Sequence, residues 1–296
     1  RLTAQTFDSN EDYLVSAAMV TNDDTSIVRV SIIDLKTGKL SYTEDITDPD
    51  VSMTNFDVEY LEGKFYLLLE KSIYLVNPDK EKISQINSEL DFGTVRSSGK
   101  LFSTEKDYSN DKLTVIISDY DGSNKDEFDV PGTWDEFVGF NNFNVVYSKS
   151  LNKSFIFIID KLFAVDMKSM DYDEIELPDN WDFTKTRYFN VTVSEDSSRV
   201  LLSDGNIVLV TDASLKEQFT INRNGTTVDC AAFKGDRIYI VGDGYLSVYD
   251  NQKGDLITKN EMKYFTEGFK TKAWFDDKAN QMYIQAEQIL FIYDLD

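Results

Sequence analysis

The chain has 296 residues, of which 41 % are hydrophobic and 13 % aromatic, so it can bury a large core and is not a disordered sequence. Its 53 Asp and Glu residues outnumber 30 Lys and Arg residues, and the formal net charge of −23 opposes binding to nucleic acid and to anionic lipid. The sequence contains no His, which excludes Ser-His-Asp hydrolysis, His-ligated zinc, iron or copper, and catalysis by a His general base.

A short apolar segment that ends on an acidic or amide residue recurs along the whole chain. The end positions, in chain order, are Asp34, Asn77, Asp119, Asp166, Asp212, Asp250 and Asp294. They follow one another at intervals of 38 to 47 residues, which is close to the length of one four-stranded β-propeller blade. The repeat therefore predicts seven blades.

The residues four and two positions before each end position are apolar in every repeat. In chain order they are Val30 and Ile32, Ile73 and Leu75, Val115 and Ile117, Leu162 and Ala164, Val208 and Val210, Leu246 and Val248, and Leu290 and Ile292. A period of two residues indicates β-strands, whereas a pair of helices in each repeat would need a period of 3.6.

A second apolar run precedes most of these strands, and a more polar run follows. The preceding runs are Phe65 to Leu69, Phe155 to Ile159, Val200 to Leu202, Ile238 to Val241 and Met282 to Ile284. Asp204-Gly205 and Asp243-Gly244 are dipeptides typical of two-residue hairpin turns. The following runs, such as Lys39 to Tyr42, Ile83 to Ile86 and Phe219 to Ile221, suit outer strands that face water.

These patterns predict an all-β fold, a β-propeller of seven four-stranded blades that forms a single domain over residues 1–296. A count of six or eight blades stays open, because the chain ends are ambiguous. We expect Leu2 to Phe7 to supply the outer strand of the last blade and close the ring. The first blade then lacks an evident innermost strand, so either that blade is short or its strand lies upstream of Arg1, where a signal or anchor would also lie.

Two stretches resemble the strand-Asp-x-x-Thr-Gly-Lys unit of YVTN and quinoprotein-like propellers: residues 31–40 (SIIDLKTGKL) and 247–254 (SVYDNQKG). A third, residues 115–124, ends in Asp-Gly-Ser-Asn and is similar to a turn in the propeller of the translocation protein TolB. These resemblances imply a fold and no chemistry. The Trp that usually follows the Thr-Gly of quinoprotein repeats is missing, so a quinone cofactor is not implied, and the Gly-His and Trp-Asp marks of WD40 repeats are absent as a set.

The sharpest local motif is a repeated Pro-x-x-Trp-Asp, which places Trp134 with Asp135 and Trp181 with Asp182 in loops between blades. Trp274, near the first strand of the last blade, is a further candidate. Aromatic side chains flanked by carboxylates on one loop face could bind a peptide or a sugar. The structural alternative is that each Trp packs between neighbouring blades.

No cofactor is predicted, although calcium is an alternative that oxygen ligands in the Asp119 to Asp126 segment would favour. That segment departs from an EF-hand loop, because Gly122 is its fourth residue and Val130 its twelfth. The single cysteine, Cys230, lies among apolar residues and is expected to be a buried thiol rather than a nucleophile.

We therefore expect a non-enzymatic binding or scaffold propeller that recognises a protein, peptide or glycan through one loop face. The alternative is a carboxylate- or calcium-dependent hydrolase or lyase with its site in the central channel. A third reading is a mainly structural part of a larger exported protein. The acidic surface favours a protein or peptide partner that is basic, and no nucleic-acid partner or membrane insertion is expected. An extracytoplasmic location, secreted or surface-anchored, is expected from the resemblances.

Overall fold

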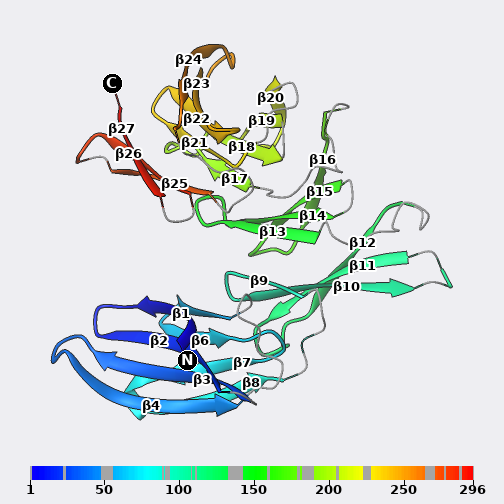
Figure 1. Ribbon diagram of the computed structural model, residues 1–296. Helices are drawn as coiled ribbons and strands as arrows, with labels where there is room; N and C mark the ends of the chain where they lie inside the picture. Colours follow the sequence, from blue (N-terminus) through cyan, green and yellow to red (C-terminus); the bar gives the residue numbers. More distant parts are fainter. Residues whose placement is uncertain are drawn as a thin grey trace. The chain divides into compact units, whose positions relative to one another are not determined.

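A computed structural model describes residues 2–22, 25–47, 56–88, 90, 94–107, 109–110, 112–132, 143–158, 161–178, 181, 190–204, 207–222, 228–263, 271–276, 278–286 and 289–295. In these residues the chain is built from strands β1 to β27 and one short 3₁₀ turn, η1 (Pro78–Lys80) (Figure 1). It folds into two compact units, residues 1–134 and 135–296. In the described part no helix is long and apolar enough to span a membrane.

Unit 1, residues 1–134, contains three four-stranded antiparallel sheets in which each strand pairs with the next along the chain. The first sheet comprises β1 (Leu2–Ser9), β2 (Tyr13–Asn22), β3 (Thr25–Asp34) and β4 (Lys39–Thr47). The second comprises β5 (Asp57–Leu61), β6 (Lys64–Leu68), β7 (Ile73–Asn77) and β8 (Lys82–Asn87). The third comprises β9 (Val95–Ser97), β10 (Lys100–Asp107), β11 (Lys112–Asp119) and β12 (Asp126–Val130).

Unit 2, residues 135–296, contains three further four-stranded sheets and a last sheet of three described strands. The first two are β13 (Phe143–Ser148), β14 (Lys153–Ile158), β15 (Lys161–Asp166) and β16 (Tyr172–Ile175), then β17 (Asn190–Val193), β18 (Arg199–Asp204), β19 (Ile207–Asp212) and β20 (Glu217–Asn222). The others are β21 (Cys230–Lys234), β22 (Arg237–Gly242), β23 (Tyr245–Asp250) and β24 (Leu256–Glu261), then β25 (Thr271–Asp276), β26 (Gln281–Ala286) and β27 (Ile289–Asp294).

The seven sheets are the blades of the β-propeller that the sequence predicts. The third strand of every sheet ends on a repeat position, from Asp34 at the end of β3 to Asp294 at the end of β27. Within each unit, first strands of neighbouring sheets contact one another. Strand β1 contacts β5, and β17 contacts both β13 and β21. Whether residues 1–296 form a single domain stays a prediction.

The expectation that Leu2 to Phe7 supplies the outer strand of the last blade is wrong. These residues lie in β1, which pairs antiparallel with β2 as the first strand of the first sheet. The reason is a local turn: the side-chain oxygen of Asn10 accepts hydrogen bonds from the N–H groups of Asp12 at 2.9 Å and Tyr13 at 2.7 Å. Closing this short hairpin costs little chain entropy.

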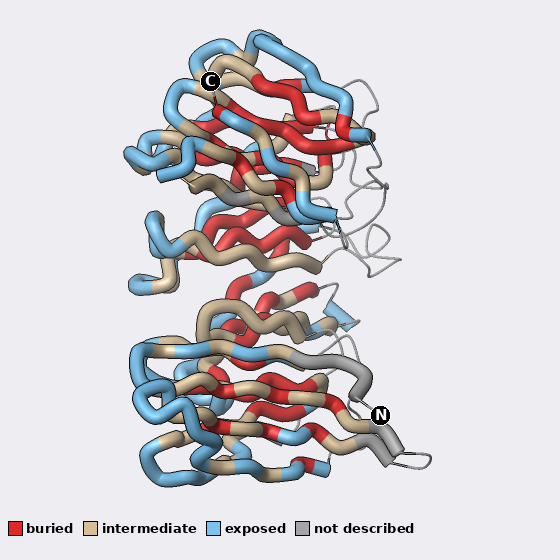
Figure 2. Tube along the Cα trace, turned by 60° about the vertical axis from the view of Figure 1, so that its left-hand side comes forward, coloured by how far each residue is buried: buried red, intermediate tan, exposed pale blue. Residues whose placement is uncertain are grey.

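The core lies between neighbouring sheets of each unit, where the apolar residues of one sheet pack on those of the next. Val30 and Ile32, for example, are fully buried in a cluster that includes Phe65 and Leu67 of the second sheet. Buried residues follow the strands and exposed residues the turns (Figure 2). The fourth strands are the most polar, and every residue of β24 is exposed. The repeat residues of β27 differ, because Leu290 and Ile292 are exposed.

The repeat ends on an acidic or amide residue because that side chain caps the turn after the third strand. The Oδ1 atom of Asp166 accepts hydrogen bonds from the N–H groups of Lys168 at 2.8 Å and Ser169 at 3.1 Å. Asp250 does the same for Gln252 and Lys253, each at 2.8 Å. These backbone bonds hold the pKa of both carboxyls below the ordinary value. Such Asx turns make a carboxylate or amide the favoured residue.

The hairpin turn at Asp243-Gly244 also follows the prediction. Both residues have positive φ, 50° and 76°, which is the two-residue turn whose twist matches the flanking strands β22 and β23. At the other dipeptide, Gly205 lies outside the described residues.

Candidate functional site

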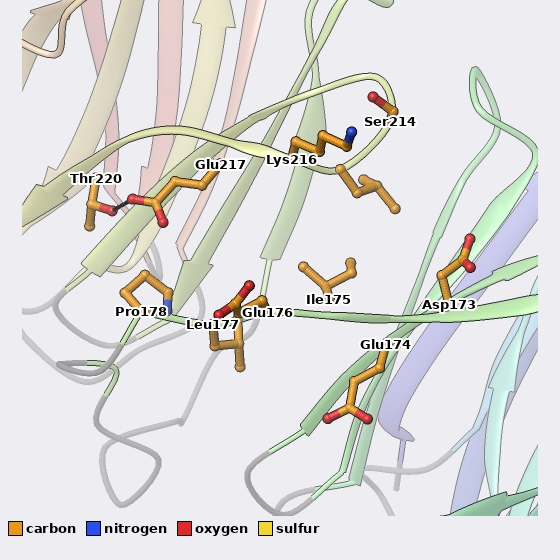
Figure 3. Close-up of a pocket in the computed structure, with 11 residues that line it drawn as sticks. Asp173, Glu174, Ile175, Glu176, Leu177, Pro178, Ser214, Lys216, Glu217 and Thr220 are labelled. Carbon is orange, nitrogen blue, oxygen red and sulfur yellow. Dashed lines mark hydrogen bonds between the residues drawn. The ribbon is translucent and has the colours of Figure 1, made fainter.

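A groove of about 980 Å³ lies between two neighbouring sheets of unit 2. One wall is the fourth strand β16 with the three residues after it, and the other is the turn between β19 and β20 with the start of β20 (Figure 3). We call it the acidic groove, and its lining residues are Asp173, Glu174, Ile175, Glu176, Leu177, Pro178, Ser214, Leu215, Lys216, Glu217 and Thr220.

The groove combines an acidic rim with an apolar floor. Four lining residues are carboxylates and one, Lys216, is a cation. Ile175 is buried, and Leu177 and Leu215 are half-buried against the core cluster that contains it. The groove therefore offers apolar contact area beside negative charge.

Two of the four carboxylates are engaged and two are available. Glu174 Oε1 accepts from Lys161 Nζ at 2.8 Å, and Glu217 Oε1 accepts from the Thr220 hydroxyl at 2.8 Å. Figure 3 shows Asp173 and Ile175 on the side of β16 that faces the opposite wall, with Glu174 on the other side. Asp173 and Glu176 are exposed, and within the described part of the chain their side chains make no hydrogen bond or ion pair, so both can bind a cation.

One wall is held in shape by the repeat residue Asp212. Its Oδ1 atom accepts hydrogen bonds from the Ser214 N–H at 2.8 Å, the Ser214 hydroxyl at 2.7 Å and the Lys216 N–H at 3.1 Å. The Ser214 hydroxyl and then the Lys216 N–H lower the pKa of Asp212, so its carboxylate stays ionised at neutral pH. The turn that presents Lys216 and Glu217 is therefore preorganised.

The end of the other wall is anchored by Trp181. The backbone N–H of Trp181 donates to the Pro178 carbonyl at 2.9 Å, and the residue is 4 % exposed. It packs among residues of both neighbouring sheets, including Ile175 and Leu209. The second Pro-x-x-Trp-Asp motif thus places Pro178 in the groove lining and Trp181 in the core beneath it.

The structure does not describe the side chains of the other residues singled out in the sequence. Trp134, Asp135 and Asp182 lie outside the described residues. Trp274 belongs to β25, and only its backbone is described. The burial of Trp181 matches the alternative in which a Trp packs between neighbouring blades. Direct contact with a ligand stays a prediction for all five candidate residues, Trp134, Asp135, Trp181, Asp182 and Trp274.

Sequence reasoning missed Asp173, Glu176 and Glu217. They lie in or beside fourth strands, where charged residues are expected on any water-facing edge. The available signal was the run 173–178 (DEIELP), in which apolar residues alternate with acids next to a Pro-x-x-Trp-Asp motif.

The Asp119 to Asp126 segment forms a turn whose carboxylates bind neighbouring side chains. Asp119 is paired with Lys100 Nζ at 2.5 Å and accepts from the Asn124 amide at 2.6 Å. Asp121 accepts from the N–H and hydroxyl of Ser123. Over the residues that the structure describes, no group of three or more Cys, Asp or Glu could hold a metal ion.

Cys230 is a free, buried thiol, as expected. Burial, with a smaller contribution from the charge of Asp229, raises its pKa to about 12. It is therefore protonated at neutral pH and a poor nucleophile.

Comparison of the chain with protein-family models and with curated proteins gives no match. Among solved structures it is similar to dihydro-heme d1 dehydrogenase NirN in complex with DHE, with a TM-score of 0.58 at 11 % identity over 99 % of this chain and 62 % of that one. It is also similar to Hsv2 of Kluyveromyces lactis with loop 6CD replaced by a Gly-Ser linker, with a TM-score of 0.52 at 11 % identity over 94 % of this chain and 87 % of that one. A third similar structure is the extracellular domain of BT4673 from B. thetaiotaomicron, with a TM-score of 0.50 at 8 % identity over 98 % of this chain and 40 % of that one.

These likenesses confirm the β-propeller fold and show nothing beyond it, because the identities are so low. The chain spans less than two thirds of the NirN and BT4673 chains.

Proposed function

We propose that this protein is a binding module that recognises a basic protein or peptide segment through the acidic groove of unit 2. The main observation in support is that an apolar floor and two carboxylates without a described partner lie in the same groove of about 980 Å³. Fold alone confers no activity, so the proposal rests on this site.

The apolar floor would supply affinity and the acidic rim would supply selectivity. Burying one Leu or Val side chain of a ligand against Ile175 and Leu177 contributes about 1.5–3 kcal/mol. Lys or Arg side chains beside Asp173 and Glu176 would speed association and fix the register of the ligand, with an effect that weakens as salt is added. The net charge of −23 acts in the same direction over longer distances.

Three finer expectations from the sequence belong to this proposal. Trp134 and, on β25, Trp274 would extend the contact with the partner, and Trp181 would hold the groove in shape. A glycan is an alternative ligand for those aromatic residues. A secreted or surface-anchored location and a repeat of the YVTN or TolB type remain proposals as well.

The test is a titration of a fluorescein-labelled peptide, acetyl-Gly-Lys-Leu-Lys-Leu-Lys-Gly-amide, read by fluorescence anisotropy at physiological salt. The site variant is Asp173→Asn/Glu176→Gln, which removes two charges from the groove with little change of shape. The matched control is Glu11→Gln/Glu127→Gln, which removes two charges from exposed positions of unit 1. A second peptide with Glu in place of Lys tests the sign of the charge.

We expect saturable binding of the Lys peptide, an affinity at least about tenfold lower for the site variant, and an affinity close to that of the parent for the control. Equal losses in the two variants would mean that only net charge matters. That result, or the absence of saturable binding, would reject the groove as the binding site.

A further inference from the structure

The acidic groove runs along the open edge of a β-strand. Its lining includes six consecutive residues, from Asp173 to Pro178. Successive side chains of a strand point to opposite faces, so a hollow lined by Asp173, Glu174 and Ile175, the last three residues of β16, must lie beside the backbone. Figure 3 agrees, because Asp173 and Ile175 lie on one side of the strand and Glu174 on the other.

The backbone of Glu174 faces that edge. Strand β16 pairs with β15 and is the last strand of its sheet in the described residues. The Asp166 N–H donates to the Asp171 carbonyl at 2.9 Å, so Asp171 directs its backbone groups toward β15. Because these directions alternate along an antiparallel strand, Asp173 also faces β15, while Glu174 directs its N–H and C=O to the open edge.

We infer that the partner segment binds in an extended conformation, adding a strand to the edge of β16 through the N–H and C=O of Glu174. This inference rests on the proposed function and specifies its geometry. In strand addition the main-chain hydrogen bonds provide affinity, and pockets that receive alternate side chains provide specificity. Partner side chains that point to the side of Asp173 and Ile175 would meet the apolar floor, and the alternate ones would point to the side of Glu174. Lys and Arg side chains are long enough to reach the rim carboxylates from either side.

Charge selects the occupant of this edge. A second copy of this chain would bring a strand with the same carboxylates, and like charges on paired strands repel. Acidic side chains on an edge strand also prevent unselective pairing with other chains. An extended segment that contains both basic and apolar residues is attracted by the carboxylates and can also fill the apolar floor.

Proline at position 174 tests the inference. Glu174→Pro removes the outward N–H, while the ladder between β16 and β15 keeps its bonds, and proline is tolerated on edge strands in this orientation. Glu174→Ala is the matched control, because both variants lose the carboxylate that pairs with Lys161 and only one loses the N–H. Both are titrated with the labelled Lys peptide, and both are checked by circular dichroism and thermal unfolding.

We expect Glu174→Pro to bind the Lys peptide at least about fivefold more weakly than Glu174→Ala, because the two variants differ in the backbone N–H and share the loss of the carboxylate. If Glu174→Pro does not fold, the same peptide carrying N-methyl groups on alternate backbone nitrogens replaces it, and its binding to the parent should weaken to a similar extent. Equal binding of the two variants, or of the methylated and plain peptides, overturns strand addition but leaves the proposed function standing. Absence of binding by the parent overturns both.

Discussion

The backbone N–H of Trp181 donates to the carbonyl of Pro178 at 2.9 Å, which fastens the end of the groove wall to a side chain buried between two sheets. Pro178 lines the acidic groove, whereas Trp181 packs in the core beneath it. A single short motif therefore connects the stability of unit 2 to the shape of its candidate binding site.

Replacing Trp181 with Ala should destabilise the protein by about 3–5 kcal/mol, because the change leaves a cavity in the core between the sheets. Trp181→Phe fills most of that cavity. It also removes an indole N–H that has no hydrogen-bond partner among the described residues, so its loss of folding free energy should be clearly smaller. Urea unfolding followed by circular dichroism measures both. A Trp181→Ala variant as stable as the parent would show that the ring is not a core residue.

Acid should remove the contribution of Asp196 to stability. Hydrogen bonds from Ser194 and Ser198 lower the pKa of this carboxyl to about 2 in the folded protein, whereas an unfolded Asp titrates near 3.9. A lowered folded pKa stabilises the native state above the unfolded value, and this stabilisation is lost as the pH falls through the folded value. The parent should therefore have a higher Tm than Asp196→Asn. This difference should be largest above about pH 5 and should decrease toward zero near pH 2.

Thermal unfolding of both proteins from pH 7 to pH 2 measures that difference. Comparing the two removes the general effect of neutralising other carboxylates, because the variant retains them. A Tm difference that is independent of pH, or that widens as the pH falls, would contradict the assigned hydrogen bonds.

Substitutions at two glycines distinguish the cost of backbone strain from the cost of steric overlap. Gly244 has φ +76° and open space where a Cβ would lie, whereas at Gly254, φ +75°, a Cβ would come within 2.9 Å of the Phe219 ring. Gly244→Ala should cost about 1–2 kcal/mol through its backbone conformation alone. Gly254→Ala should cost more, because β20 must also shift. Equal losses in urea unfolding would show that the Phe219 ring moves freely.

The repeat was readable in the sequence because its physical cause is local. Asp166 and Asp212 cap turns within four residues of themselves, so the side chain and the turn it binds occupy one window of sequence. The first strand was misplaced because Leu2 to Phe7 is an apolar and polar mixture that fits either end of the chain, and the short turn at Asn10 decides between them.

The candidate site was less predictable because it depends on contacts between distant segments. Asp173 and Glu217 belong to different sheets and share a groove only after those sheets pack together. The buried position of Trp181 likewise depends on residues of two sheets, including Phe155 and Val200. In sequence, an exposed aromatic residue in a loop and one that packs between sheets have the same appearance.

Hydrogen exchange of the intact chain, measured by mass spectrometry with and without saturating Lys peptide, shows directly whether the acidic groove is where the peptide binds. We expect slower exchange of backbone amides in residues 171–178 and 212–220, the two walls of the acidic groove, with little change in β12 or β24. Protection confined to other parts of the chain, with these two segments unchanged, would contradict this expectation.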